Sequence, residues 1–351
     1  MTTTTSSTST PAAIATNKLG LTKQDYVGSK STLCPGCGHD AITAQIIQAA
    51  YEMNLEPHMV AKLSGIGCSS KTPAYFLSQA WGFNSVHGRA AAILTGTTLA
   101  NRNLLNLVVS GDGDSMSIGL GQFAHMIRRN VPAVYIIEDN GVYGLTKGQF
   151  SATADLGSTL KHGDINELPP LDPCTLAMEL GCGFVARSFS GNPKQLAVIL
   201  KAAMAYQGTA LIDVISPCVT FNNHDSSTRS YKNAKDRETP LQELGFVPYY
   251  DLAEVEIPAG ETREVTLPDG SQLKLRAIHT DFDPTDRYAS MKAIHESQDR
   301  GEFLTGILHI NTGKPTLHDY THTIHEALGT LPQATVKPGP DVLAACMQEL
   351  M

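Results

Sequence analysis

Apolar strand-like runs alternate with amphipathic helical stretches over residues 22–220, and this alternation limits the possible folds more than any other feature of the sequence. Leu105–Val109 and Val131–Ile137 have the composition of buried strands, and residues 115–130 between them repeat apolar side chains at helical spacing. Strands that alternate with helices at such spacing form a parallel sheet with helices on both faces. We therefore expect an α/β fold with a doubly wound, mostly parallel sheet.

Composition divides the chain into three regions. Residues 1–21 begin with a stretch of mostly Thr, Ser, Ala and Pro that lacks charged side chains, so we expect a disordered leader and not a targeting signal. Residues 22–220 form the sheet domain. Residues 221–351 are predicted to be an appendage that packs on that domain or on a partner. It should contain a β-hairpin, with strands at residues 261–267 and 272–278 joined by the Pro268–Ser271 turn, and a last helix over residues 341–351.

Bulk composition excludes several classes of protein. A chain of 351 residues with 42% hydrophobic and 17% charged residues is globular, not disordered. The net charge of −8 and the lack of a Lys/Arg cluster argue against a nucleic-acid partner. No apolar run reaches the about 20 residues that span a bilayer, so we expect no membrane association and a cytoplasmic protein. The odd number of cysteines, seven, argues against a secreted disulfide framework.

A glycine-rich turn carries the first chemical signal. Gly111–Asp114 lies between a predicted strand and a helix that starts at Ser115, and Asn140 follows Asp112 by 28 residues, at the end of the next strand. Glycines let the backbone approach a diphosphate, and a helix start offers free N–H groups. Carboxylate and amide oxygens are the ligands that Mg²⁺ prefers. Gly-Asp-Gly alone is a common turn, but its pairing with Asp139–Gly144 one βαβ unit later favours a site for magnesium and a diphosphate.

Four cysteines lie in loops marked by glycine or proline. Cys34 and Cys37 form a Cys-x-x-Cys motif, Cys68 follows Gly-Ile-Gly, and Cys218 follows Ser-Pro after a strand. Four thiolates suffice for a [4Fe–4S] cluster and equally for zinc, and their spacing does not decide between the two. The other three cysteines have no such context, and we expect buried thiols at Cys174, Cys182 and Cys346.

The order of these motifs resembles a known family. CPGCGH, GIGCSS, HGRA, GDGDSMSIG, DNGVYGLTKGQ and SPC occur in this order in the beta subunits of 2-oxoacid:ferredoxin oxidoreductases, and the match covers about residues 25–225. The resemblance implies a thiamine-diphosphate-binding fold. It implies that Asp112, Asn140 and the carbonyl of Val142 hold Mg²⁺, and that the cysteines at 34, 37, 68 and 218 hold one [4Fe–4S] cluster near the thiamine ring.

The same resemblance implies further contacts to the cofactor. The residues concerned are Gly111, Gly113, Asp114, Ser115, Asn140, Gly144, Leu145, Thr146, Gly67, Ser69 and His39. His87, in His-Gly-Arg, is similar to a family segment near the diphosphate, although a histidine in the core or at a helix cap is an equal alternative.

Two lysines beside these motifs bear on the substrate. Lysines are usually solvated surface residues, but Lys71 and Lys147 lie in glycine-rich loops, and similar enzymes place these positions, with Leu145, around the 2-oxoacid. Two ammonium groups suit a second carboxylate, so we expect 2-oxoglutarate, with pyruvate or a broad range of 2-oxoacids as the alternative. The stretch 281–287 also looks like the 2-oxoglutarate branch of the family.

The resemblance implies a reaction and partners. A CoA-dependent enzyme of this family decarboxylates the 2-oxoacid oxidatively and passes electrons one at a time through the cluster to ferredoxin. The glutamate that activates thiamine would come from the pyrimidine domain of an alpha subunit, so we expect an αβ or (αβ)₂ assembly that is inactive without that subunit. Two rival interpretations are a zinc-stabilised α/β binding module and a thiamine-dependent decarboxylase or synthase without a cluster.

Overall fold

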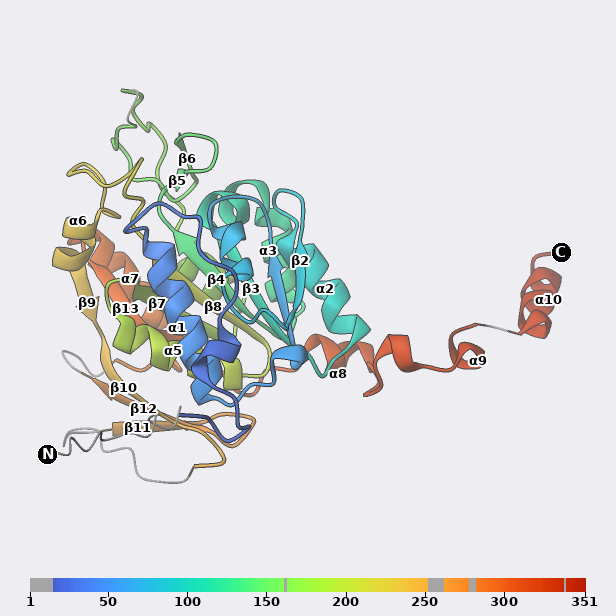
Figure 1. Cartoon of the computed structure of the whole chain (residues 1–351). Helices are drawn as coiled ribbons and strands as arrows, with labels where there is room; N and C mark the ends of the chain where they lie inside the picture. The colour runs from blue at the N-terminus through green and yellow to red at the C-terminus, as the bar shows by residue number, and fades with distance from the viewer. Residues whose placement is uncertain (1–14, 161–162, 252–261, 278–281, 338) are drawn as a thin grey trace, which may run out of the picture.

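The fold is built on an eight-stranded sheet with helices on both faces (Figure 1). The computed structural model describes residues 15–160, 163–251, 262–277, 282–337 and 339–351. In the order β2-β1-β3-β4-β8-β7-β13-β9, the strands of this sheet are Trp81–Asn84, Val60–Ser64, Leu105–Gly111, Ala133–Asp139, Thr209–Ile215, Phe184–Phe189, Phe303–Ile310 and Glu238–Pro240. All neighbours are parallel except β13 and β7, so the predicted α/β fold with a mostly parallel sheet is confirmed.

The central strands β4 and β8 are buried along their whole length because both faces of the sheet are covered. Every residue of β4 and β8 is buried, as expected for a parallel sheet between two helix layers. Successive side chains of β4 point to opposite faces. Val134 and Ile136 therefore join one core cluster, and Tyr135 and Ile137 join the other.

The helices form two layers, one over each face. α1 (Gly38–Glu52) and α5 (Pro193–Ala205) cover one face and contact each other. The second layer contains α2 (Ala90–Ala100), α3 (Leu120–Arg128), α4 (Pro173–Glu179) and α7 (Arg287–Asp299). The remaining short elements are β5 (Val142–Tyr143), β6 (Gln149–Phe150), α6 (Tyr231–Arg237), α8 (Leu317–Thr321), α9 (Gln333–Val336) and α10 (Pro340–Glu349), with 3₁₀ turns at Lys23–Tyr26, Pro57–Met59, Ser69–Ala74 and Leu328–Thr330.

A small antiparallel sheet packs beside α5. Its strands are β10 (Gln242–Val247), β12 (Gln272–Ala277) and β11 (Thr262–Thr266), in that order. The predicted hairpin is confirmed, and Gly270 takes a φ of 88° in its turn. The hairpin ends expected at residues 261 and 278, like residue 281 of the 281–287 stretch, lie outside the described residues.

Parts of the two flanking regions belong to the folded body. β13 and β9 belong to the main sheet, so residues 221–351 are not simply an appendage: Leu304, Ile307 and Leu308 are buried in the same cores as the earlier strands. Residues 1–14 of the expected leader lie outside the described residues, but Asn17 donates a hydrogen bond to the Tyr26 hydroxyl (2.8 Å), so residues 15–21 belong to the folded body.

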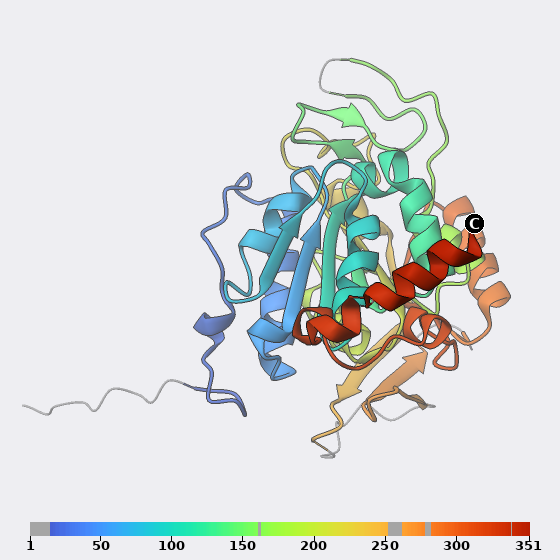
Figure 2. The same cartoon turned by 90° about the vertical axis from the view of Figure 1, so that its right-hand side faces the viewer.

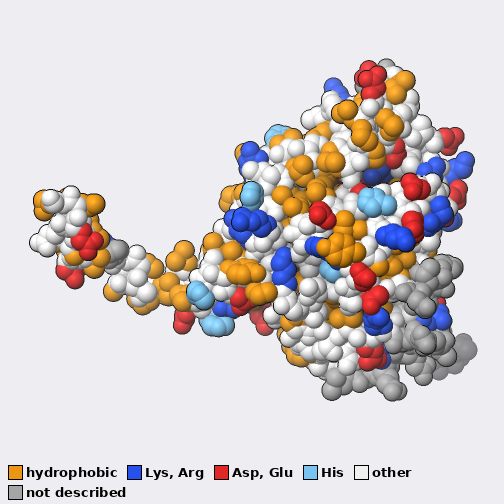
Figure 3. All heavy atoms as spheres, turned by 180° about the vertical axis from the view of Figure 1, so that it is seen from behind, with side chains coloured by type: hydrophobic (Ala, Val, Ile, Leu, Met, Phe, Trp, Pro, Cys, Tyr) orange, Lys and Arg blue, Asp and Glu red, His pale blue; other side chains and the backbone are white. Residues whose placement is uncertain are grey.

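The end of the chain leaves the body. α9 and α10 lie apart from the sheet domain in Figure 1, and Figure 3 shows apolar side chains along this segment. Neither helix buries any of its residues, although both are fully described. Cys346 on α10 is therefore exposed, and the prediction of a buried thiol there was wrong, whereas Cys174 and Cys182 are buried as predicted.

The parallel arrangement gathers the loops that follow β1, β3, β4 and β8 at one edge of the sheet. Figure 2 shows the strands side by side, with the green loop segment that follows β4 beyond their ends. Ligands of such sheets bind at the carboxyl edge. Within the described ranges, no helix combines the length and the apolar composition needed to cross a membrane.

One buried amide joins the small sheet to the main one. Gln242 donates through Nε2 to the Ile307 carbonyl (2.9 Å) and accepts from the Ile307 N–H through Oε1 (3.0 Å), next to an irregularity in the β13–β7 pairing. Gln242→Leu leaves both backbone groups buried without partners, so we expect it to lower the free energy of unfolding by about 2–4 kcal/mol in chemical denaturation. The neighbouring, partly exposed pair Glu243–Arg276 is the control, because Glu243→Ala should cost less than about 1 kcal/mol. Equal effects of the two substitutions would contradict this role of Gln242.

Candidate active site at the carboxyl edge of the sheet

Two adjoining cavities at the carboxyl edge contain most of the residues singled out in the sequence. The smaller cavity is lined by His39, Ile66, Gly67, Cys68, Ser69, Gly111, Asp112, Gly113, Asp114, Asn140, Val142, Tyr143 and Gly144. The larger, of about 180 Å³, is lined by all four cysteines expected at the cluster together with Thr32, Leu33, His39, Lys71, Asn140, Gly144, Leu145, Val219, Thr220 and Phe221. The cavities share His39, Cys68, Asn140 and Gly144. The fold thus brings the two predicted sites into contact.

Asp112 lies at the end of β3 and has one oxygen in use. Its Oδ2 accepts hydrogen bonds from the Gly141 N–H (2.9 Å), the Thr153 hydroxyl (2.7 Å) and the Ser151 hydroxyl. Among the described residues, no hydrogen bond reaches Oδ1. Burial, and then the neighbouring Asp139, raise the pKa of Asp112 to about 7, so a nearby cation would favour the ionised form of this carboxyl. An open oxygen on such a group fits a divalent metal.

Asn140 and Val142 lie beside Asp112 on the turn that follows β4. The Asn140 Oδ1 accepts from the Val142 N–H at 3.0 Å, and its main-chain carbonyl accepts from Asn222 Nδ2 at 2.7 Å. The turn requires a φ of +75° at Gly141, and a Cβ there would stand 2.8 Å from Asn222 Nδ2, so glycine is needed. All three predicted metal ligands therefore line one cavity, and their oxygen donors are of the type that Mg²⁺ takes.

Asp114 connects three segments around the smaller cavity. Its Oδ1 accepts from the main-chain N–H groups of Ile66 (3.1 Å) and Gly88 (2.7 Å), and its Oδ2 accepts from the Ser110 hydroxyl (2.8 Å). The carboxylate is thus occupied with protein donors, although Asp114 lines the cavity. The predicted helix after it begins differently: residues 113–118 form a π-helical turn before α3.

Some predicted cofactor contacts lie elsewhere. The Ser115 hydroxyl is 2.9 Å from the Tyr135 hydroxyl in the core, and Thr146 is exposed. Lys71 and Leu145 line the larger cavity, but His87 and Lys147 are exposed and are not among the described residues that line either cavity. The roles of all six positions stay predictions.

The thiols of the larger cavity are spread around it. Burial raises the pKa of Cys37 to about 12 and raises that of Cys68, so both thiols stay protonated until a metal displaces the proton. Cys34 is exposed, and its sulfur accepts from the Thr220 hydroxyl at 3.3 Å. Within the described ranges, no three His, Cys, Asp or Glu side chains are placed to hold a single metal ion.

Sequence reasoning missed a buried acid beside these thiols. Glu138 is fully buried at the end of β4, and neither of its carboxyl oxygens has a hydrogen-bond partner among the described residues. Burial raises the pKa of Glu138 well above its usual range and lowers the pKa of His39 to about 4. His39 Nδ1 lies 3.5 Å from Glu138 Oε2, and both shifts favour the neutral form of each group. Two consecutive acidic residues at the end of an otherwise apolar strand were the available signal.

Gly65 allows the loop after β1 to approach Asp114. A Cβ at this position would stand 1.7 Å from Asp114 Oδ2, so Gly65→Ala must displace the carboxylate and its bonds to Ile66 and Gly88. We expect the free energy of unfolding to fall by about 2–4 kcal/mol, measured by thermal melts. Gly121→Ala in α3 is the matched control, since nothing lies within 4 Å of its Cβ. A Gly65→Ala protein that melts like the control would refute this packing argument.

Comparison with known proteins agrees with this geometry. Residues 65–214 match the family model described as "Thiamine pyrophosphate enzyme, C-terminal TPP binding domain". The chain is 44% identical over 221 residues to a Sulfolobus 2-oxoacid:ferredoxin oxidoreductase subunit beta, which covers 62% of this chain and 70% of the relative. It is 38% identical over 205 residues to the 2-oxoglutarate oxidoreductase subunit KorB of Mycobacterium tuberculosis, with 58% of this chain and 54% of the relative covered.

A solved structure is similar over nearly the whole chain. The 2-oxoglutarate:ferredoxin oxidoreductase from Magnetococcus marinus, with 2-oxoglutarate, coenzyme A and succinyl-CoA bound, superimposes with a TM-score of 0.71 at 30% identity, covering 94% of this chain and 100% of the matched chain. The chain spans between 54% and 70% of the lengths of five curated relatives. The fold, the motifs and these similarities together show that the chain belongs to the beta subunits of the 2-oxoacid:ferredoxin oxidoreductases.

Proposed function

We propose that this chain binds thiamine diphosphate, Mg²⁺ and one [4Fe–4S] cluster as the beta subunit of a CoA-dependent 2-oxoacid:ferredoxin oxidoreductase. With its alpha subunit, the enzyme decarboxylates a 2-oxoacid to acyl-CoA and CO₂ and reduces ferredoxin. The observation that carries the proposal is that three oxygen donors and four cysteines from distant loops line two adjoining cavities at one edge of the sheet. The family's cofactor supplies the electron sink for decarboxylation, and the cluster supplies one-electron transfer.

The smaller cavity suits the magnesium and the diphosphate. Asp112, Asn140 and the Val142 carbonyl would hold the metal, and Gly111 and Gly113 let the backbone approach phosphate oxygens. A Cβ at Gly113 would stand 2.4 Å from the Tyr143 ring, and Tyr143 in turn donates to the Gly113 carbonyl at 2.9 Å. This packing keeps the glycine backbone exposed to the cavity.

The larger cavity suits a polynuclear cluster better than a zinc ion. A single tetrahedral zinc needs its sulfur ligands converging on one point. The four cysteines instead surround a space of about 180 Å³, and the described residues contain no group of three that converges on one ion. The same arrangement weighs against a thiamine enzyme without a cluster, which has no use for four cysteines at this place.

The partners follow from the incomplete site. An alpha subunit would supply the pyrimidine half of the cofactor site. The edge strand β2 and the loop after it expose Trp81 (66%), Phe83 (55%) and Val86 (70%), which supports a covering chain at this end of the sheet. An αβ or (αβ)₂ assembly is proposed. All seven cysteines are free, which suits the reducing cytoplasm where we place the enzyme.

Lys71 supports 2-oxoglutarate as the preferred substrate. It lines the larger cavity near Cys68 and Leu145, where its ammonium can pair with a carboxylate. The bound ligands of the Magnetococcus marinus enzyme and the name of the Mycobacterium tuberculosis relative point to 2-oxoglutarate. The name of the Sulfolobus relative, a 2-oxoacid enzyme, supports the alternative of a broader range that includes pyruvate.

The function can be tested on the assembled enzyme. The chain should be purified anaerobically with its alpha subunit and assayed for reduction of a viologen dye with 2-oxoglutarate, pyruvate and 2-oxobutyrate, each with and without CoA. We expect CoA-dependent reduction, fastest per unit concentration with 2-oxoglutarate. Dye reduction that is independent of CoA, or absent with every 2-oxoacid, would refute the proposal.

We predict that Cys218 is a ligand of the cluster. Cys218→Ser should lower bound iron and acid-labile sulfide by at least half and bleach the visible absorption, because a serine hydroxyl replaces a thiolate that the cluster needs. Cys174→Ser is the control, since that thiol is buried in the core away from both cavities and should keep its iron. Full iron in the Cys218 variant would reject the assignment.

We predict that Lys71 reads a substrate carboxylate. A charge-assisted hydrogen bond contributes roughly 1.5–3 kcal/mol, so Lys71→Met should raise the KM for 2-oxoglutarate about 10- to 150-fold. Lys147→Met should have a smaller effect because Lys147 is exposed, and Lys292→Met on α7 should have none. Unchanged pyruvate kinetics in Lys71→Met would place the lysine at the distal carboxylate. An unchanged KM for both substrates would exclude the contact.

A further inference from the structure

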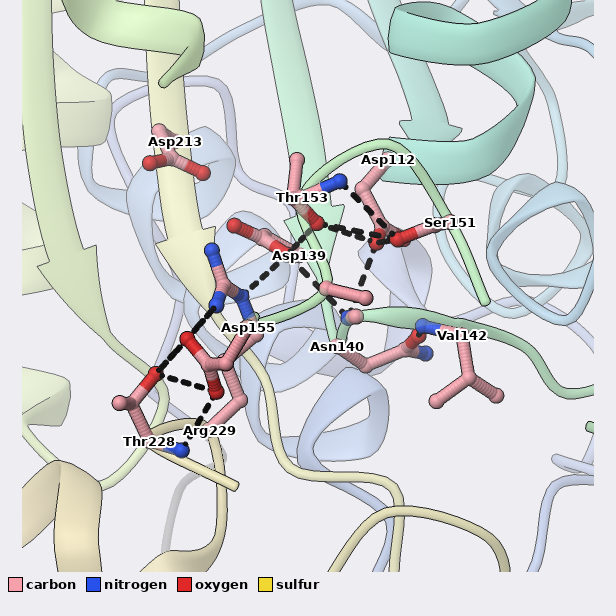
Figure 4. Close-up of polar contacts among 12 residues, drawn as sticks. Asp112, Asp139, Asn140, Val142, Ser151, Thr153, Asp155, Asp213, Thr228 and Arg229 are labelled. Atoms are coloured by element: carbon pink, nitrogen blue, oxygen red, sulfur yellow. Dashed lines mark hydrogen bonds and ion pairs between the residues drawn. The ribbon is translucent and has the colours of Figure 1, made fainter. Parts of the chain in front are cut away.

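Arg229 lies behind the proposed magnesium ligands and joins two loops (Figure 4). Its Nε donates to Asp139 Oδ1 at 2.8 Å, and its Nη1 donates to Asp155 Oδ1 at 3.1 Å. The arginine is 6% exposed. Asp139 immediately precedes Asn140, and Asp155 closes the segment that begins at Ser151. A single buried guanidinium thus spans from the end of β4 to the loop after β6.

The second of these loops holds Asp112. Ser151 and Thr153 both donate to its Oδ2, and the Thr153 hydroxyl lies 2.7 Å from Asp112 Oδ2 and 2.7 Å from Asp139 Oδ1. Figure 4 shows these contacts as one connected network. The position of Asp112 therefore depends on a loop that Arg229 ties to the Asn140 turn.

Charge explains why a cation is needed at this point. Asp112 and Asp139 are both fully buried, and Asp139 Oδ2 has no hydrogen-bond partner among the described residues. A buried carboxylate without a counter-charge is costly. Arg229 pairs with Asp139, which leaves Asp112, with its open Oδ1, as the carboxylate for a divalent cation.

Arg229 also belongs to the segment that starts at Cys218. Asn222 in this segment donates to the main-chain carbonyl of Asn140 at 2.7 Å, and its own N–H donates to the Cys218 carbonyl at 3.0 Å. Thr228, next to Arg229, contributes two hydrogen bonds to Asp155, from its N–H (2.7 Å) and its hydroxyl. The segment thus contacts the Asn140 turn at two points, through Asn222 at the Asn140 carbonyl and through Arg229 at Asp139.

We propose that Arg229 is a positioning residue of the magnesium site. By bridging Asp139 and Asp155, it fixes the turn that carries Asn140 against the loop that holds Asp112, so the metal ligands are in place before the cation binds. The inference rests on the proposed function. Residues that orient metal ligands typically change metal affinity by about 10- to 100-fold when replaced.

The chain offers a matched control in Arg187. This arginine is 3% exposed and also bridges two carboxylates, Asp172 (2.6 Å) and Asp213 (2.8 Å). In the described part of the chain it makes no hydrogen bond to the two loops that Arg229 joins. Arg187→Met therefore removes a comparable buried ion pair without touching the proposed metal ligands.

The test uses the αβ enzyme stripped of Mg²⁺ and saturated with thiamine diphosphate. Calorimetric titration with Mg²⁺ should give a Kd raised about 10- to 100-fold in Arg229→Met and less in Arg229→Lys, which keeps the charge but not the bridge. In the dye assay, the apparent KM for Mg²⁺ should rise by the same factor while kcat at saturating Mg²⁺ recovers. Arg187→Met should leave the Mg²⁺ Kd within about twofold of the parent.

The Mg²⁺ Kd of the arginine variants can contradict the proposal. An unchanged Mg²⁺ Kd in Arg229→Met, or an equal rise in Arg187→Met, would overturn it. If Arg229→Met does not assemble, Arg229→Lys decides, and an unchanged Kd in that variant overturns it too. Asp112→Ala separates the two levels: if it leaves Mg²⁺ binding intact, the proposed magnesium site itself fails, whereas loss in Asp112→Ala with unaffected Arg229 variants rejects the positioning role alone.

Discussion

The parallel pairing of β3, β4 and β8 is the constraint on which the whole site depends. Backbone hydrogen bonds hold Gly111 beside Glu138 and Asp139 beside Ile215, so the three strands end at one level. Asp112, Asn140 and Cys218 each follow one of these ends within a few residues. A slip of one residue would turn every core side chain to the opposite face of the sheet, so the packing on both faces fixes the register. The same packing that stabilises the sheet therefore sets the distances between the proposed metal ligands.

Three carboxyl groups are buried at this edge, and contacts with the surrounding loops determine how each is accommodated. Asp112, Glu138 and Asp139 are fully buried at the ends of two adjacent strands, and burial raises the pKa of Asp112 and of Glu138. The three differ in their surroundings: Asp139 is paired with Arg229, burial raises the pKa of Glu138 well above its usual range, and no hydrogen bond from the described residues reaches one oxygen of Asp112. The three states follow from what each carboxyl contacts. Of these three acids, Asp112 is the one that lines the smaller cavity with an open oxygen, so this arrangement favours binding of a cation at Asp112.

Local patterns predicted the parts of this structure that are encoded locally. The strands β3 and β4, the helix α3 and the hairpin β11–β12 follow from local sequence patterns, and the glycine and cysteine motifs identified both cavities. Long-range choices were not predictable. Nothing local states that β13 pairs antiparallel with β7, or that Arg229 and Thr153 reach loops far away in the sequence. The prediction for Cys346 was wrong for a related reason: α10 is apolar in part, but none of its residues is buried by the part of the chain that the structure describes.

The same packing places a shared wall between the two cavities. His39, Cys68, Asn140 and Gly144 line both cavities, so one layer of residues separates the proposed thiamine and cluster sites. Gly144 lies close to two of the sulfurs: a Cβ there would stand 3.4 Å from the Cys68 sulfur and 3.7 Å from the Cys218 sulfur. A larger side chain would enter the space that a cluster bound to these sulfurs must occupy. At Gly144 no side chain stands between the backbone of the turn and the two sulfurs, and this short separation would favour passage of electrons between the two proposed sites.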